Sequence, residues 1–233
     1  MLFRSQNTSK IPNNNYTLHQ SSYVNYNWNN SFDNEKINTI KVEANTEWLN
    51  ASAQFTSLND HLYFTELIAT DLLQLVTPQQ YNKTINYISI KASKKIKFRK
   101  WALDNTILYQ NVSQEDAILN LPQIVTRNSL YYTNKLFKKA LFIQTGVTFN
   151  YFTKHFANDY NPLLAESFVQ KSKEIGNFPM IDFFINARIR QARIFLKAEH
   201  FNSGFTGNDF YTASNYPYRD FMIRFGLVWN FFQ

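Results

Sequence analysis

The C-terminal stretch from Phe221 to Gln233 constrains the fold more than any other part of the chain. Apolar side chains occupy every second position there, at Phe221, Ile223, Phe225, Leu227, Trp229 and Phe231. The positions between them are Met222, Arg224, Gly226, Val228 and Asn230. A period of two places alternate side chains on opposite faces of an extended strand. The stretch is therefore predicted to be a β-strand with one apolar face and one face that carries charge.

The same alternation recurs along the chain and predicts about ten strands in all. The further strands are expected within residues 24–28, 40–48, 51–64, 88–97, 101–109, 124–133, 141–151, 181–189 and 193–199. Residues 1–19 are polar and rich in Asn, and we expect them to be irregular. Residues 20–233 are expected to form one β-domain.

The lengths of the connections alternate as well. Short turns are expected at 49–50, 98–100, 134–139 and 190–191, and long connections at 65–83, 113–123, 155–178 and 204–218. If the C-terminus lies in the periplasm, the short turns fall on the periplasmic side of the membrane and the long connections on the external side. The one exception is the brief turn at 32–35, which is external. This parity is the rule for membrane barrels. The pattern therefore favours an all-β fold, an antiparallel up-and-down transmembrane β-barrel in the bacterial outer membrane.

Composition agrees with strands that face lipid on one side and water on the other. Aromatic residues make up 17% of the chain, yet its mean hydropathy is −0.39. No apolar run is long enough for a transmembrane helix. The chain has no cysteine, which excludes disulfides and thiolate metal sites. The net charge is +7, but Lys and Arg are spread along the chain, so no nucleic-acid partner is expected.

Two sets of residues carry barrel signals. The spacing of Arg224, Gly226, Trp229 and Phe231 resembles the closing-strand signal that outer-membrane barrels present to their assembly machinery. The expected partners are therefore that machinery and outer-membrane lipid. Aromatic side chains concentrate at the two membrane interfaces of a barrel. The predicted aromatic girdle consists of Trp28, Trp48, Trp101 and Trp229, with Trp28 near the rim opposite the other three.

The inward register is polar and predominantly basic. The predicted pore-lining residues are Lys41, Glu43, Lys91, Asp104, Arg127, Asp182, Arg188, Arg193, Lys197, Glu199 and Arg224. Glu47, Lys95 and Lys97 share that register. Excess positive charge would favour anionic solutes. The alternative is that these charges form paired networks that only solvate the lumen.

No catalytic, cofactor or metal site is expected. The four histidines, His19, His61, His155 and His200, lack the spacing of metal ligands. His200 with Ser203 is the one candidate pair for a hydrolase, and no nucleophile motif supports it. We therefore expect neither an enzyme nor a cofactor.

Several segments resemble a known family. They are Arg127–Tyr132, Leu136–Leu141, Ile175–Pro179, Ala192–Phe195 and Glu199–Gly204. In these the chain is similar to the β-barrel porins of Bacteroidetes-type outer membranes, over roughly its last 135 residues and more loosely before them. Members of that family are longer and begin with a signal peptide. The resemblance implies that this chain corresponds to their C-terminal portion and that further strands complete the barrel.

Three functions remain open from the sequence. The first is a porin for passive diffusion of small hydrophilic solutes, anions among them. The second is a non-conducting outer-membrane barrel with a structural or assembly role. The third is a soluble β-sandwich that binds glycans through exposed Tyr and Trp.

Overall fold

The computed structural model describes residues 1–21, 26–67, 75–207 and 210–229, and within them the chain is almost entirely β-structure. The strands are β1 (Leu2–Lys10), β2 (Leu18–His19), β3 (Trp28–Asn29), β4 (Glu35–Asn45), β5 (Asn50–Asn59), β6 (His61–Leu67), β7 (Leu75–Tyr81), β8 (Ile85–Phe98), β9 (Trp101–Ser113), β10 (Ile124–Leu136), β11 (Leu141–Phe152), β12 (Asp159–Asn161), β13 (Glu166–Val169), β14 (Met180–Ile189), β15 (Ala192–Glu199), β16 (Tyr211–Ala213), β17 (Tyr216–Pro217) and β18 (Met222–Trp229). The helices are single turns, α1 (Asn14–Thr17) and α2 (Ser203–Thr206).

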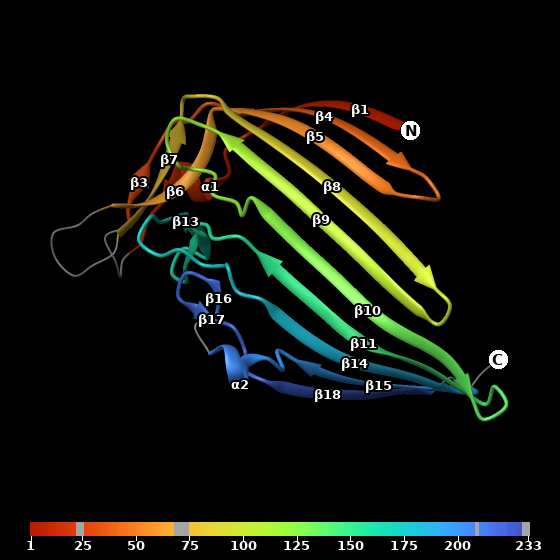
Figure 1. Ribbon diagram of the computed structural model, residues 1–233. Coiled ribbons are helices and arrows are strands. Elements are labelled where there is room, and N and C mark those ends of the chain that lie inside the picture. The colour runs from red at the N-terminus through yellow and green to blue at the C-terminus, as the bar shows by residue number, and fades with distance from the viewer. Residues whose placement is uncertain (22–25, 68–74, 208–209, 230–233) are drawn as a thin grey trace.

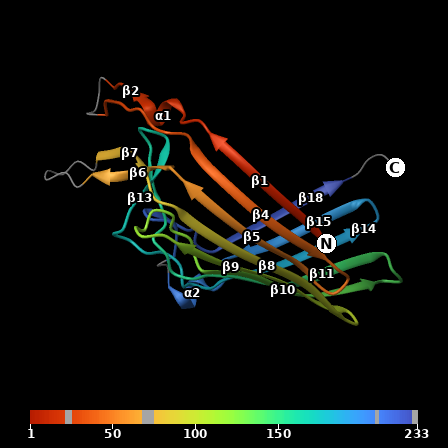
Figure 2. The ribbon, with the colours of Figure 1, turned by 90° about the horizontal axis from the view of Figure 1, so that it is seen from above.

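Ten of these strands form one large antiparallel sheet. Its order is β1-β4-β5-β8-β9-β10-β11-β14-β15-β18, so each strand pairs with the next main-sheet strand along the chain. This is up-and-down topology, and the predicted all-β fold with about ten strands is confirmed. Figures 1 and 2 show that the sheet curls into a trough, with β1 and β18 as its two edges.

The two ends of the trough differ, as the connection lengths predicted. At one end, on the right in Figure 1, short turns join β4 to β5, β8 to β9, β10 to β11 and β14 to β15. Arg99 and Arg190 have φ angles of 54° and 51° in two of these turns, the conformation that primed hairpin turns use. The longer connections all lie at the other end, which we call the loop end.

The first strand of the main sheet is not where the sequence predicted it. Residues 2–10, expected to be irregular, form β1, which pairs with β4 from Leu2 opposite Glu43 to Lys10 opposite Glu35. This edge strand carries few apolar side chains, because its backbone hydrogen bonds to β4, rather than an apolar face, hold it in the sheet. In the expected strand at 24–28, Val24 lies outside the described residues, and Trp28 belongs to the short β3.

The expected connection at 65–83 is also partly strand. It contains all of β7 and the end of β6, and the pairing of the two strands places Pro78 opposite Phe64. β7 is an edge of the small sheet β12-β13-β6-β7, and edge strands are where a sheet tolerates proline.

The loop end contains most of the buried apolar side chains of the described residues. One cluster joins Tyr26, Phe64, Val76, Leu164 and Phe168, with Tyr16 and Trp28 packed against it. A second joins Tyr81, Ile85, Ile118 and Val169. The first cluster draws on the connections before β4, before β8 and between β11 and β14. These connections therefore fold together into a cap with its own core. Burial there, with Glu166 and Glu35 nearby, raises the pKa of Tyr16 to about 12.

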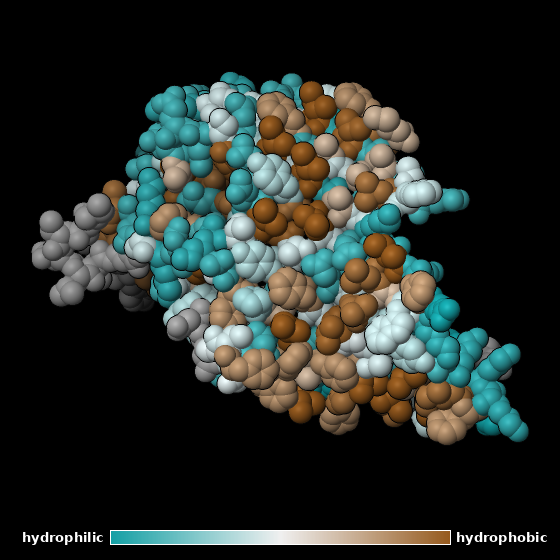
Figure 3. Space-filling model, in the orientation of Figure 1, coloured by the Kyte–Doolittle hydropathy of each residue, from teal (hydrophilic) through white to brown (hydrophobic). Residues whose placement is uncertain are grey.

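The outward face of the main sheet is apolar and open. One row across it runs through Ile96, Leu103, Leu130, Val147 and Phe183, each opposite the next. Figure 3 shows hydrophobic side chains gathered over this face, with hydrophilic ones toward the loop end and the turn tips. Phe225 on β18 is 81% exposed. Among the described residues, no helix is long and apolar enough to cross a membrane.

Candidate functional site

The inward, concave face of the trough carries the polar register. Residues directly opposite each other in neighbouring strands share a face. One inward row runs from Lys95 through Asp104, Ser129 and Thr148 to Asp182. Continuing the register places all the predicted pore-lining residues on this face: Lys41, Glu43, Lys91, Asp104, Arg127, Asp182, Arg188, Arg193, Lys197, Glu199 and Arg224. The structure thus brings them together, and their function as pore lining stays a prediction.

An ion-pair cluster occupies the concave face near the loop end of β14, β15 and β18. The Lys197 Nζ atom lies 3.0 Å from an oxygen of Asp182 and 3.0 Å from one of Glu199. The Arg224 Nε atom lies 3.1 Å from the other Glu199 oxygen, and Arg219 reaches the same oxygen at 3.9 Å. Both carboxylates are largely buried, and the cations around them compensate their charge. On β4, Lys41 and Glu43 form a further pair at 2.6 Å.

Other cations on this face have no such partner. Lys91, Arg127, Arg188 and Arg193 take part in no ion pair within the part of the chain that the structure describes. The guanidinium carbon of Arg188 lies 5.6 Å from the centre of the Phe142 ring, a cation–π contact. Glu43, Asp182 and Glu199 are each paired with a cation, and Asp104 is the one predicted pore-lining carboxylate without an ion pair within the described residues. The four unpaired cations outnumber it, so the concave face keeps an excess of positive charge.

Two glycines let aromatic rings lie against the wall of the trough. Gly226 is directly opposite Phe195, and a Cβ atom at Gly226 would lie 2.2 Å from Cε1 of that ring. Gly146 is directly opposite Tyr131, and a Cβ atom there would lie 2.2 Å from the Leu130 carbonyl oxygen. Sequence reasoning treated Gly226 only as part of a terminal signal. The glycine–aromatic pairing across strands became visible only with the register.

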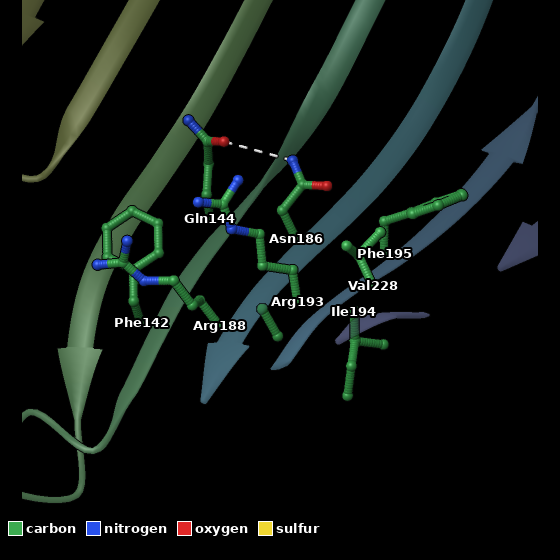
Figure 4. Close-up of a pocket in the computed structure, with 9 residues that line it drawn as sticks. Phe142, Gln144, Asn186, Arg188, Arg193, Ile194, Phe195 and Val228 are labelled. Atoms are coloured by element: carbon green, nitrogen blue, oxygen red, sulfur yellow. Dashed lines mark hydrogen bonds between the residues drawn. The ribbon is translucent and has the colours of Figure 1, made fainter. Parts of the chain in front are cut away.

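Two pockets open onto the concave face and adjoin one another. One, of about 500 Å³, lies toward the short-turn end and is lined by Phe142, Gln144, Asn186, Ala187, Arg188, Arg193, Ile194, Phe195 and Val228. The other, of about 410 Å³, shares Gln144, Asn186 and Phe195 and adds Asp104, Arg127, Tyr131 and Lys197 among others. Figure 4 shows the first pocket, with Arg188 across the Phe142 ring and Arg193 extending toward Gln144. Asn186 Nδ2 donates to Gln144 Oε1 at 3.3 Å.

The predicted girdle residues lie at the expected ends of the trough. Trp48 is in the turn before β5, Trp101 begins β9 and Trp229 ends β18, all at the short-turn end. Trp28 is at the loop end, but it packs against the cap cluster and stacks on His19. Whether these side chains meet a membrane interface stays a prediction. Phe231 of the closing-strand signal lies outside the described residues.

The histidines occupy structural settings. His200 is buried among Phe178, Phe210 and Tyr218, and its Nδ1 atom lies 2.9 Å from the Arg219 carbonyl oxygen. The Ser203 N–H donates to the His200 carbonyl oxygen, a backbone turn rather than a nucleophile–base contact. Burial lowers the pKa of His155 in the loop-end cap. No cluster of three or more metal-ligating side chains occurs among the described residues.

Comparisons with known proteins bear on the fold and on the family of this chain. A solved structure of the "Copper transporter OprC" is similar, with a TM-score of 0.64 and 13% sequence identity. The match covers 96% of this chain and 36% of that chain, so the present chain spans about a third of the length of that protein. At this identity the likeness shows the fold alone. A search of curated proteins finds no match. Residues 2–233 match the family described as "Putative porin", and the chain belongs to that family.

Proposed function

We propose that this protein lines an aqueous path across the bacterial outer membrane, through which small hydrophilic solutes diffuse passively and anions pass preferentially. The single observation that carries the proposal is the imbalance of charge on the concave face. Three carboxylates there are held by cations at 2.6–3.1 Å. Lys91, Arg127, Arg188 and Arg193 have no carboxylate partner among the described residues.

Fixed charge inside a pore sets the sign of the ions that enter it. Family membership and the barrel fold support the transport role, and the exposed apolar outward face supports a lipid setting. The same exposed face disfavours the soluble sandwich, because no second sheet covers it in the described structure. The non-conducting barrel remains the competing proposal, and conductance decides between them.

The test is the reversal potential of single channels in planar bilayers under a potassium chloride gradient. The full-length protein is compared with Lys91→Gln and Arg127→Gln, alone and combined. Each change removes one inward positive charge, so the reversal potential should move stepwise toward cation preference. Lys138→Gln is the matched control, since Lys138 lies in the exposed turn between β10 and β11. Absence of channels would support the non-conducting barrel. A reversal potential of the unmodified protein that favours cations would refute the anion preference, and unchanged selectivity in all three variants would refute its origin in these charges.

A further inference from the structure

The hairpin of β14 and β15 sets two arginines side by side on the concave face. Arg188 and Arg193 are directly opposite each other in the register. Like charges in that position destabilise a strand pair. Neither has an ion pair within the described ranges, although carboxylates pair with Lys197 on β15 and with Arg224 on the neighbouring β18. An anion placed between the two guanidinium groups would relieve this repulsion.

The surroundings of the arginines specify more than charge. Phe142 lies under Arg188 at 5.6 Å and fixes one wall. Phe195, 43% exposed, and Val228, 52% exposed, present apolar surface on the opposite side of the pocket. The Phe195 ring is held there because Gly226 leaves room for it. The amides of Gln144 and Asn186 lie between these walls and offer donors and acceptors (Figure 4).

We propose that this pocket is a binding subsite for small carboxylates with an apolar, preferably aromatic, body. The inference rests on the proposed transport function and names its solute class. Arginine binds a carboxylate with two parallel hydrogen bonds, and the rings of Phe142 and Phe195 pack against the body of the solute. A pocket of about 500 Å³ is of the size that holds small ligands. A hydrated inorganic anion would leave the apolar walls without a partner.

The arginines are exposed at the pocket, so binding is weak and reversible, as passage through a pore requires. The subsite lies toward the short-turn end, and the second pocket, which contains Arg127 and Lys197, adjoins it on the side away from that end. The two pockets together place Arg127, Arg188 and Arg193, which have no ion pair among the described residues, along one stretch of the concave face.

The test is isothermal titration calorimetry of the full-length protein in detergent micelles, with phenylacetate as the probe. Acetate, inorganic phosphate and benzylamine serve as comparison ligands. We expect phenylacetate to bind several-fold more tightly than acetate or phosphate, and benzylamine not to bind. Arg188→Gln and Arg193→Gln should each weaken phenylacetate roughly tenfold, the loss of one charge-assisted contact. Phe195→Leu should weaken phenylacetate and leave acetate unchanged.

Arg190→Asn is the matched control, because Arg190 sits in the turn of the same hairpin and its side chain does not line the pocket. Its φ of 51° is one that Asn tolerates. Heat-dependent gel mobility confirms that each variant is folded. Equal affinity for phenylacetate, acetate and phosphate, no phenylacetate binding, or equal loss in Arg190→Asn would each overturn the inference. Calorimetry needs no current, so binding without channels would refute the porin function alone, and channels without binding would refute the subsite alone.

Discussion

Replacing Gly226 with Ala should destabilise the last strand pair through one side chain, Phe195. The new methyl carbon would lie 2.2 Å from Cε1 and 2.6 Å from Cζ of that ring. β18 is hydrogen-bonded to β15 at this position, so the backbone resists moving away. The clash is with the far end of a flexible side chain, and the ring therefore swings off the sheet into the lumen.

The magnitude follows from the burial that the ring gives up. Full burial of a Phe side chain is worth about 1.5–3 kcal/mol. Phe195 is already 43% exposed, so moving it into water forfeits about 1 kcal/mol. An unfavourable rotamer adds about 0.5–1.5 kcal/mol. We expect the free energy of unfolding to fall by about 1.5–2.5 kcal/mol, the sum of the two, which is within the range known for overpacked sites.

The assay is urea unfolding of the purified protein refolded in detergent, followed by tryptophan fluorescence. Gly204→Ala is the matched control, because a Cβ atom at Gly204 meets nothing within 4 Å. In a double-mutant cycle with Phe195→Leu, the two changes should couple by about 1 kcal/mol. Unchanged stability of Gly226→Ala, or strict additivity in the cycle, would refute the steric account. Gly226 would then matter only during assembly in the cell, as the terminal-signal interpretation holds.

Three further changes test other parts of the structure. Gly146→Ala should lower the free energy of unfolding more than Gly226→Ala does, by about 3 kcal/mol, or prevent refolding, because the new Cβ atom would lie 2.2 Å from the Leu130 carbonyl oxygen of the backbone. The same urea assay compares the two variants. Glu199→Gln removes an inward negative charge, so the reversal potential should shift toward anion preference. The free energy of unfolding should fall by only about 1 kcal/mol, because the cationic partners of Glu199 are 38–53% exposed. His155 has a pKa lowered by burial, so its stabilising contribution is complete above the ordinary value of 6.5 and declines as the pH falls below it. The protection factor of the Ile175 amide, which is its exchange rate relative to the intrinsic rate at the same pH, should therefore be lower at pH 5 than at pH 7.5, because Ile175 is paired with His155, and His155→Phe should remove that difference.

The main sheet could be predicted because its two faces meet different surroundings. In the predicted strands from β4 onward, apolar and polar side chains alternate, so the period of two identified both the strand and its orientation. The register that places Lys95, Asp104 and Asp182 in one row follows from that alternation once neighbouring strands pair in order. Connection lengths then fixed the direction of each strand, which is why the short turns were correctly assigned to one end.

The remaining features depend on contacts between distant segments. β1 has no apolar stripe, and only its pairing with β4 shows it to be a strand. The Phe195–Gly226 and Tyr131–Gly146 pairs require the register to one residue. The ion pairs of Glu199 join β15, β18 and the connection before β18, so charge counting along one strand could not show which cations were already neutralised.

The position of the buried core supports the same functional argument from another direction. A soluble sheet protein buries one face of its main sheet, and that face supplies the core. Here the apolar face is outward and exposed, the inward face is charged, and the dry clusters around Phe64 and Ile85 belong to the cap at the loop end. In water such a sheet would leave its largest apolar surface unsatisfied. In a bilayer, hydrocarbon covers the outward face, water fills the inward one, and only the external loops need a core of their own. The cap is therefore the part of this chain that buries a core as soluble proteins do, and the exposed outward face of the trough is the part that the proposed membrane setting would cover.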